Sequence, residues 1–166
     1  MKIRDIMSTP VIRIHPEETV AVAARMLERS NIGALPVCGS DGRMCGLLTD
    51  RDIVTRCLAA GRSPSTTPVK AIMTTGVVSA PPDMELGLAA GLMGRRQIRR
   101  LPVTENGKLC GMLSLGDLAL KEESSIDAGD ALTEISDHLS SQFCAMSTEC
   151  VQMCTNKIHK NKCRNL

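Results

Sequence analysis

Apolar residues recur at helical spacing in two stretches of this chain, from Thr19 to about Arg29 and from about Met84 to Arg96. Such spacing places apolar side chains on one face of a helix. In the first stretch this face carries Val20, Ala23, Ala24 and Leu27. Pro16-Glu17-Glu18-Thr19 precedes it, and proline with acidic residues is typical of a helix start. We therefore expect two amphipathic helices in corresponding parts of the chain.

Each of these helices is followed by apolar runs that favour strands. Leu35 to Cys38 and Met44 to Thr49 flank a Gly-Ser-Asp-Gly turn and predict a hairpin, and Leu101 to Ser114 predicts a second hairpin. A short strand is expected before each amphipathic helix, and a further helix after each hairpin. These elements are expected at Val11 to Ile14, Val77-Val78, Asp50 to about Ala60, and Gly116 to about Lys121.

An internal repeat explains this doubled order. Ile6-Met7 recurs as Ile72-Met73, and Leu35-Pro36-Val37 recurs as Leu101-Pro102-Val103. Two copies of one supersecondary unit therefore occupy most of the chain. The pattern predicts an α+β fold built from two β-α-β-β-α repeats.

The predicted domain organisation follows from the repeat. After the second copy, Leu132, Ile135 and Leu139 recur at helical spacing and predict an amphipathic C-terminal helix that packs on the core. The expected divisions are repeat 1 at residues 1–61, a linker at 62–68, repeat 2 at 69–121, the C-terminal helix at 122–142, and a basic, cysteine-rich tail at 143–166.

The composition narrows the function classes. Among 166 residues there is one Phe and neither Trp nor Tyr, so the chain lacks the aromatic platforms on which single-strand nucleic-acid binders stack bases. A net charge of +2 does not by itself imply a polyanion partner, and these two features argue against nucleic acid. No stretch reaches the length of a membrane span, and no export signal is present. We expect a cytoplasmic protein, no membrane partner, and reduced thiols at its eight cysteines.

Two short motifs carry the candidate chemistry. In each copy a strand ends in a hydroxyl residue, Thr49 or Ser114, and an aspartate follows three positions later, Asp52 or Asp117. A helix start offers unpaired N–H groups that suit a phosphate, and a carboxylate there can accept both hydroxyls of a ribose. The same spacing is close to a capping box, in which the two side chains only satisfy their own helix. Either interpretation fits one motif alone, and the duplication favours a nucleotide site.

Three motifs in order resemble a tandem pair of cystathionine-β-synthase (CBS) domains. They are Asp5-Ile6-Met7, Ile32-Gly33-Ala34-Leu35-Pro36-Val37 and Gly46-Leu47-Leu48-Thr49-Asp50-Arg51-Asp52, with counterparts in the second copy. The resemblance covers residues 1 to about 121, and Leu58-Ala59-Ala60-Gly61-Arg62 is similar to the small stand-alone bacterial members. It implies two repeats packed about a pseudo-twofold axis, with two clefts between them, and a homodimer.

The resemblance also implies a ligand and its contacts. The family's usual ligands are AMP, ADP, ATP or S-adenosylmethionine, bound as regulatory ligands with no cofactor required. Asp52 and Asp117 would accept the ribose hydroxyls, and Thr49 and Ser114 would contact the α-phosphate. One cleft would combine Val11, Ile12, Ile32 and Gly33 with Met112, Ser114 and Asp117. The other would combine Val77, Val78, Ile98 and Arg99 with Leu47, Thr49 and Asp52.

Arg99 and Arg100 occupy positions where the resemblance implies phosphate-binding basic residues, although with Arg95 and Arg96 they could equally be a solvated charge cluster. The first copy carries Gly33 and Ala34 there. We therefore expect the two clefts to differ, and the cleft lined by Arg99 to favour more phosphate.

Three functional classes follow. The leading hypothesis is a non-enzymatic regulatory module that binds an adenosyl ligand and signals to an unknown effector protein through a domain or dimer rearrangement. The structural alternative is an unliganded dimerisation module. An enzyme is disfavoured because no nucleophile has an adjacent base and no P-loop pattern occurs.

The tail offers a fourth possibility. Cys150, Cys154, His159 and Cys163 are ligand types of a zinc knuckle, although their spacing departs from the usual short Cys-x2-Cys opening. A zinc-dependent interaction protein is therefore an alternative function, and a disordered extension is the plainer interpretation of the tail.

Overall fold

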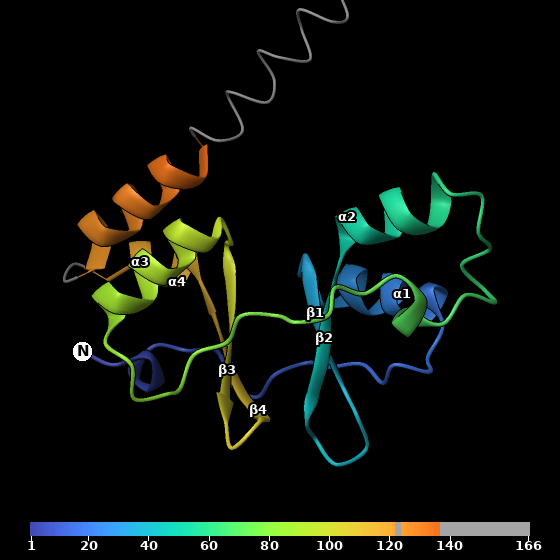
Figure 1. Ribbon diagram of the computed structural model, residues 1–166, viewed down its shortest axis with the longest axis horizontal. Coiled ribbons are helices and arrows are strands. Elements are labelled where there is room, and N and C mark those ends of the chain that lie inside the picture. Colours follow the sequence, from blue (N-terminus) through green and yellow to red (C-terminus); the bar gives the residue numbers. More distant parts are fainter. Residues whose placement is uncertain (122–123, 137–166) are drawn as a thin grey trace, which may run out of the picture.

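The computed structural model describes residues 1–121 and 124–136, and these residues form two similar halves (Figure 1). Each half contains a long helix, an antiparallel hairpin and a shorter helix, as the repeat predicts. The first half comprises α1 (Val20–Ser30), β1 (Ala34–Cys38), β2 (Met44–Thr49), α2 (Asp50–Asp52) and its π-helical continuation η2 (Ile53–Leu58). The second comprises α3 (Leu86–Arg96), β3 (Arg100–Glu105), β4 (Lys108–Ser114) and α4 (Leu115–Ala119). Short 3₁₀ turns η1 (Ile3–Asp5) and η3 (Val69–Ala71) precede them, and residues 125–136 form a C-terminal helix.

The two long helices begin and end close to the expected positions. Thr19 caps α1, because its side chain accepts a hydrogen bond from the backbone N–H of Val22 at 3.4 Å. The helices α1 and α3 end at Asn31 and Gln97, whose left-handed φ values are 50° and 54°. Left-handed residues at these positions let the backbone reverse and satisfy the last helical carbonyls.

The first strand expected in each repeat is reduced to a single bridge. Ile14 pairs in parallel with Val37, with hydrogen bonds from Ile14 N to the Pro36 carbonyl at 3.0 Å and from Cys38 N to the Ile14 carbonyl at 2.9 Å. The next bond of this ladder would need an N–H at Pro36, which proline lacks. Pro102 stops the corresponding bridge between Ala80 and Val103 in the same way. The residues directly before Ile14 and Ala80 therefore have no backbone partner among the described residues. This corrects the strands expected at Val11 to Ile14 and at Val77-Val78.

Each half has its own core, and each core includes a segment from the start of the other repeat. Ile3 is fully buried among the residues of α3, β3 and β4. Val69 and Ile72 are buried among those of α1, β1 and β2. Backbone hydrogen bonds also join each of these segments to the other repeat. Ile3 N donates to the Met84 carbonyl at 2.9 Å, and Val69 N donates to the Glu18 carbonyl at 2.8 Å. The repeats thus exchange their first segments.

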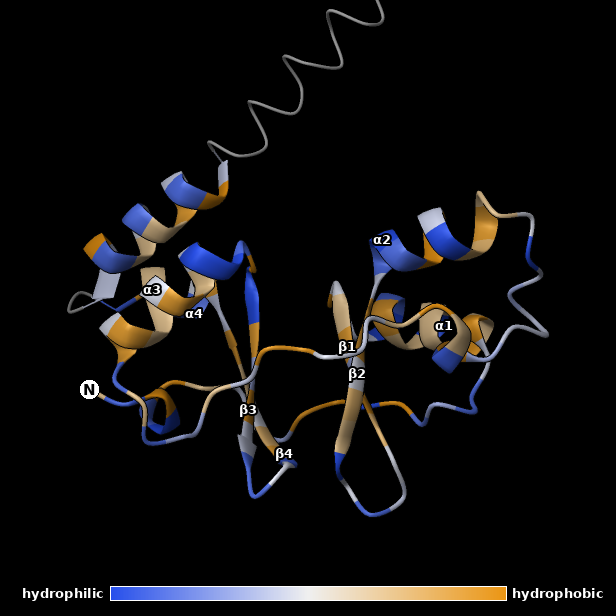
Figure 2. Cartoon of the chain, in the orientation of Figure 1, coloured by the Kyte–Doolittle hydropathy of each residue, from blue (hydrophilic) through white to orange (hydrophobic). Residues whose placement is uncertain are grey.

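The exchanged segments also pair with the second strand of each hairpin. Ser8 and Met112 form two hydrogen bonds of 2.8 and 3.2 Å, and Leu47 and Thr74 form two of 2.9 Å. The chain then crosses between the halves, and Figure 2 shows the two crossing segments as apolar where they pass between the hairpins. Both crossings lie where the two hairpins face one another, so they help to hold the halves together (Figure 1).

Glycines make this pairing possible. A Cβ at Gly46 would lie 2.7 Å from the Thr74 carbonyl oxygen and 2.8 Å from the Met73 sulfur. A Cβ at Gly111 would contact the sulfur of Met7 in the equivalent place. Only glycine lets the exchanged segments approach the strands this closely.

Ion pairs at the surface also connect the first segment of each repeat to the other repeat. Lys2 contacts Asp83 at 3.0 Å, Arg4 contacts the same carboxylate, and Lys70 contacts Glu17 at 2.8 Å. The hydrogen bond from Lys2, together with the charge of Arg4, lowers the pKa of Asp83. All of these groups are well exposed, so they add little to stability.

The C-terminal helix packs on the second half, but its buried face differs from the expected one. Ala128, Ala131 and Ile135 are buried, whereas Leu132 is 45% exposed. A Cβ at Gly94 of α3 would lie 3.3 Å from the Cα of Ala131, so this close helix contact favours small residues over leucine. Leu139 and the rest of the tail lie outside the described residues. In the part of the chain that is described, no helix is long and apolar enough to cross a membrane.

The exchange predicts that Gly46→Ala destabilises the protein. The new methyl group would collide with the backbone carbonyl of Thr74, which cannot move without breaking its bridge to Leu47. We expect the free energy of unfolding to fall by about 1–3 kcal/mol, measured by urea denaturation. Gly129→Ala is the matched control because nothing lies within 4 Å of its Cβ position in the C-terminal helix. It should be neutral or stabilising by up to about 1 kcal/mol, and equal effects of the two changes would contradict the packing described.

Candidate functional site

Two clefts lie between the repeats. The first has a volume of about 270 Å³ and the second about 780 Å³. The first is lined by Ser8, Pro10, Val11, Ile12, Asn31, Ile32, Ala34, Pro36, Arg100, Met112, Ser114 and Asp117. The second is lined by Gly33, Ala34, Leu47, Thr49, Asp50, Arg51, Gln97, Ile98, Arg99, Arg100 and Ile135.

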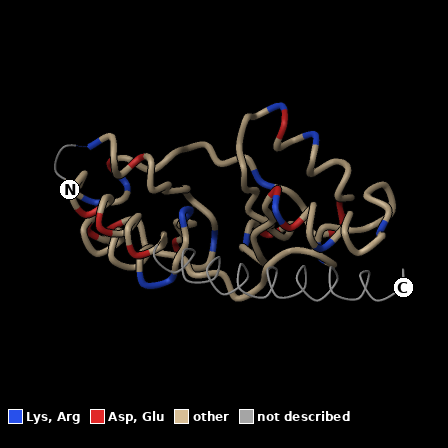
Figure 3. Tube along the Cα trace, turned by 90° about the horizontal axis from the view of Figure 1, so that it is seen from above, with Lys and Arg blue, Asp and Glu red and all other residues tan. Residues whose placement is uncertain are grey.

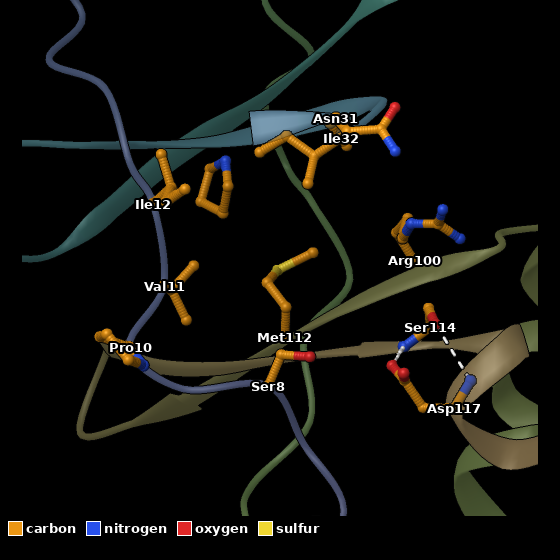
Figure 4. A pocket seen from close by; sticks show the side chains of 12 residues that line it. Ser8, Pro10, Val11, Ile12, Asn31, Ile32, Arg100, Met112, Ser114 and Asp117 are labelled. Carbon is orange, nitrogen blue, oxygen red and sulfur yellow. Dashed lines mark hydrogen bonds between the residues drawn. The ribbon is translucent and has the colours of Figure 1, made fainter. Parts of the chain in front are cut away.

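The first cleft has an apolar part and a polar part (Figure 4). Val11 and Ile12 of the crossing segment lie on one side of Met112, and Ile32 approaches from above in this view. Arg100, Ser114 and Asp117 gather at the other end. Ligand pockets are commonly apolar with a few convergent polar groups, and this cleft has that character.

The backbone beside the apolar part is open to hydrogen bonding. Pro36 ends the parallel ladder after Ile14, so Val11 and Ile12 make no backbone hydrogen bond to any other described residue. Extended backbone with unpaired N–H and C=O groups can pair with the edge of a planar base. The same proline that shortens the first strand therefore exposes a strip of donors and acceptors along the cleft.

Both hydroxyl-x-x-aspartate motifs form capping boxes. In the second repeat, Ser114 N donates to Asp117 Oδ2 at 2.7 Å and Asp117 N donates to Ser114 Oγ at 3.1 Å. In the first, Thr49 N donates to Asp52 Oδ2 at 2.9 Å and Asp52 N donates to Thr49 Oγ1 at 3.2 Å. The local role that the spacing predicts is thus present in both copies. A carboxylate has further lone pairs, so this role leaves room for a ligand.

The two aspartates differ in their surroundings. Asp52 is only 8% exposed, its second oxygen lies 3.4 Å from Nε of Arg56, and its Oδ2 also accepts the Thr49 hydroxyl at 2.7 Å. Asp117 faces the first cleft, and no ion pair to it is found among the described residues. One carboxylate is therefore committed to its own helix, while the other keeps one oxygen available.

The structure brings most of the predicted residues of the first cleft together. All of them line it except Gly33, which lies in the second cleft. In the second cleft Leu47, Thr49, Ile98 and Arg99 meet as predicted, but Val77, Val78 and Asp52 are not among its lining residues. The ligand roles of all these residues stay predictions.

Several lining residues were not foreseen from the sequence. Ser8 and Pro10 reach the first cleft because the exchanged segment runs past β4. Ile135 reaches the second cleft from the C-terminal helix. Arg100 and its counterpart Ala34 line both clefts, although Arg100 was expected only as one of two phosphate-binding arginines. No signal in the sequence indicated its place between the clefts.

The cysteines in the described part are all free, but they are not equally buried. Cys38 and Cys57 are buried, Cys110 is half-buried and Cys45 is exposed. Cys45 follows Met44 in β2, opposite the register shift between Val37 and Cys38, and its side chain is exposed although the surrounding sequence is apolar. Burial raises the pKa of the Cys38 thiol and that of Cys110.

The zinc candidates Cys150, Cys154, His159 and Cys163 lie outside the described residues. Within residues 1–121 and 124–136, no group of three or more His, Cys, Asp or Glu side chains is placed to hold a metal ion.

Comparison with known families agrees with the doubled architecture. The model of the CBS domain matches residues 3–59 and again residues 69–123. The chain belongs to the CBS domain family. The CBS domain-containing protein YhcV of Bacillus subtilis (strain 168) is 44% identical over 134 residues, which cover 81% of this chain and 94% of that protein.

Solved structures of CBS proteins are similar to this one. The crystal structure of Hypoxic Response Protein I, a protein of Mycobacterium tuberculosis, with two coordinated zinc ions has a TM-score of 0.67 and 35% identity, covering 72% of this chain and 97% of that one. The CBS domain pair of protein MJ0100, in complex with 5-methylthioadenosine and S-adenosyl-L-methionine, has a TM-score of 0.65 and 28% identity, covering 72% and 93%. The two-repeat fold predicted from the sequence is confirmed.

The burial pattern predicts the order of cysteine reactivity. At pH 8, iodoacetamide should alkylate Cys45 at least about tenfold faster than Cys38, because Cys38 is buried and its raised pKa lowers its thiolate fraction. Peptide mass spectrometry at several times of reaction measures each site separately. In urea the difference should disappear, and equal rates in the native protein would contradict the described difference in burial.

Proposed function

We propose that this protein is a non-enzymatic regulatory module that binds an adenosyl ligand in the first cleft. The observation that carries the proposal is Asp117, a carboxylate facing a cleft whose other end is aliphatic and bordered by unpaired backbone. This combination suits a ribose joined to a flat, apolar-faced base. The volume of about 270 Å³ lies near the lower end of ligand pockets, which span roughly 300–1,000 Å³.

Each part of the ligand has a matching group. The base would lie between the aliphatic side chains of Ile12, Ile32 and Met112, with its edge paired to the open backbone of the crossing segment. The free oxygen of Asp117 would accept the ribose hydroxyls, while its other oxygen keeps the capping bond to Ser114. Arg100 is the cation at the polar end for a phosphate.

Relatives support the ligand class. The CBS pair of MJ0100 forms a complex with 5-methylthioadenosine and S-adenosyl-L-methionine, and its fold is similar over most of this chain. Those two compounds share an adenosyl group and differ beyond it. We therefore assign the adenosyl group to the first cleft and leave AMP, ADP, ATP and S-adenosylmethionine as the compounds to test.

The signal would be a change in how the two repeats sit against each other. The cleft takes residues from both halves, so a ligand in it contacts both and favours the arrangement that binds it more tightly. A homodimer, an unknown effector protein and a cytoplasmic location belong to the same proposal. Nucleic acid is not part of it, because Lys and Arg alternate with Asp and Glu over both repeats rather than forming one basic face (Figure 3).

Two alternatives have specific support. The capping boxes are complete without a ligand, which favours an unliganded structural module. Hypoxic Response Protein I has two coordinated zinc ions, which favours a zinc-dependent protein, here through Cys150, Cys154, His159 and Cys163. Zinc chloride, with and without EDTA, is therefore included among the compounds tested.

The test is calorimetric titration with AMP, ADP, ATP, adenosine and S-adenosylmethionine, supported by thermal melting. A ligand at about a hundred times its dissociation constant should add about 2.7 kcal/mol of stability. Asp117→Asn should weaken adenosyl binding at the first cleft at least about tenfold, because a charged acceptor of the ribose hydroxyls is lost. Asparagine can still accept the capping bond from Ser114 N, so the fold should persist.

Asp52→Asn is the matched control from the other repeat. Asp52 does not line either cleft, so this change should leave adenosyl affinity within about twofold. Equal losses in the two variants would contradict the assignment of Asp117. Absence of any adenosyl binding would favour the structural module, and a melting shift with zinc alone would favour the zinc alternative.

A further inference from the structure

Only two residues in the described chain line both clefts, Ala34 and Arg100. They occupy equivalent positions, because each directly precedes a Leu-Pro-Val run and pairs with the hydroxyl residue of its own motif. In register, Ala34 lies opposite Thr49 and Arg100 opposite Ser114. The wall shared by the two clefts therefore carries a methyl group on one side and a guanidinium on the other.

Arg100 is not committed to either cleft. Its side chain is exposed, its Nη1 donates to the Arg99 carbonyl at 3.0 Å, and no ion pair to a carboxylate is found for it among the described residues. Arg99, by contrast, lines only the second cleft. The two clefts thus differ in the number of arginines that line them. The second has Arg51, Arg99 and Arg100, while the first has Arg100 alone.

We propose that Arg100 is a shared phosphate-binding residue that makes the two clefts compete for anionic adenosyl ligands. The proposal rests on the function proposed above, extends adenosyl binding to the second cleft, and specifies how the first is regulated. A guanidinium that pairs with a phosphate in one cleft is no longer available to the other. Binding in either cleft therefore weakens binding in the other, by the same factor in both directions.

Competition for the Arg100 guanidinium predicts that ligands with a phosphate and ligands without one differ in how their two binding events are coupled. Adenosine has no phosphate, so it fills either cleft without engaging the guanidinium, and any coupling between its two binding events comes from a rearrangement of the repeats. AMP engages the guanidinium, and its two binding events are coupled. Comparing the two compounds therefore separates competition for Arg100 from a rearrangement of the repeats, because a rearrangement would couple adenosine as well.

The experiment uses variants that fill one cleft with an uncharged side chain. Ile12→Trp blocks the first cleft at a position that is 43% exposed, and Ile98→Trp blocks the second. Leu47→Trp replaces Ile98→Trp if melting shows that the latter does not fold. Each block is verified when the stoichiometry of adenosine falls from two to one per chain. Titration of AMP into each variant then gives the association constant of one cleft by itself.

In a protein with independent clefts, the product of the two stepwise AMP constants equals the product of the two single-cleft constants. We expect the wild-type product to be at least about fivefold smaller. In the Arg100→Gln background the two AMP products should agree as closely as the two adenosine products do. Arg96→Gln is the matched control, because it removes an exposed arginine that lines neither cleft. In this variant the product of the stepwise AMP constants should stay at least about fivefold below the product of the single-cleft constants, a difference called the shortfall below. For adenosine the ratio of the two products should be the same with and without Arg100.

Several outcomes overturn the proposal. Equal AMP products in the wild type, a larger wild-type product, or a shortfall that survives Arg100→Gln would each exclude competition through this residue. Adenosine and AMP binding at one cleft only would overturn the competition and leave the proposed function standing. Absence of binding by any adenosyl compound would overturn both.

Discussion

The exchange of the first segments between the repeats is the constraint on which the rest of the structure depends. Ile3 completes the core of the second repeat, and Val69 and Ile72 complete the core of the first. Neither core can form fully unless the chain crosses between the halves, so burial of these residues also fixes how the hairpins face each other. Hydrophobic burial is not directional, but the backbone bonds at Ser8 and Thr74 give it a register.

The clefts are a consequence of those crossings. After pairing with the opposite hairpin, each segment returns to its own repeat, and Pro36 or Pro102 prevents it from pairing until Ile14 or Ala80. Backbone hydrogen-bonding groups without partners are costly when buried, and the first crossing segment lies along the open first cleft. Pro36, which interrupts the parallel pairing, thus leaves backbone donors and acceptors open along the first cleft.

The two repeats supply two similar clefts, and a few residues make the clefts different. Arg56 neutralises Asp52 in the first repeat, whereas Asp117 faces its cleft without an ion pair among the described residues. Arg100 occupies the position where the first repeat has Ala34, so a single guanidinium lines both clefts. The asymmetry lies in charge rather than in backbone, since both capping boxes have the same geometry. A fold built from two similar repeats can therefore carry two clefts of unequal charge.

The repeat, the helices α1 and α3 and both hairpins could be predicted from the sequence, because periodicity and motif spacing are local properties. Half of the residues that line the first cleft followed from the family resemblance. The exchange of Ile3 and Val69 could not be predicted, since apolar residues bury equally well in either core and only the packed chain chooses between them. The same reason applies to Arg100, Ile135 and the exposed Leu132, whose surroundings come from elements distant in sequence. The sequence by itself determined the two repeats, their main helices and hairpins, and the two capping motifs. Only the tertiary structure decided which residues share a cleft, because that depends on how the two halves cross.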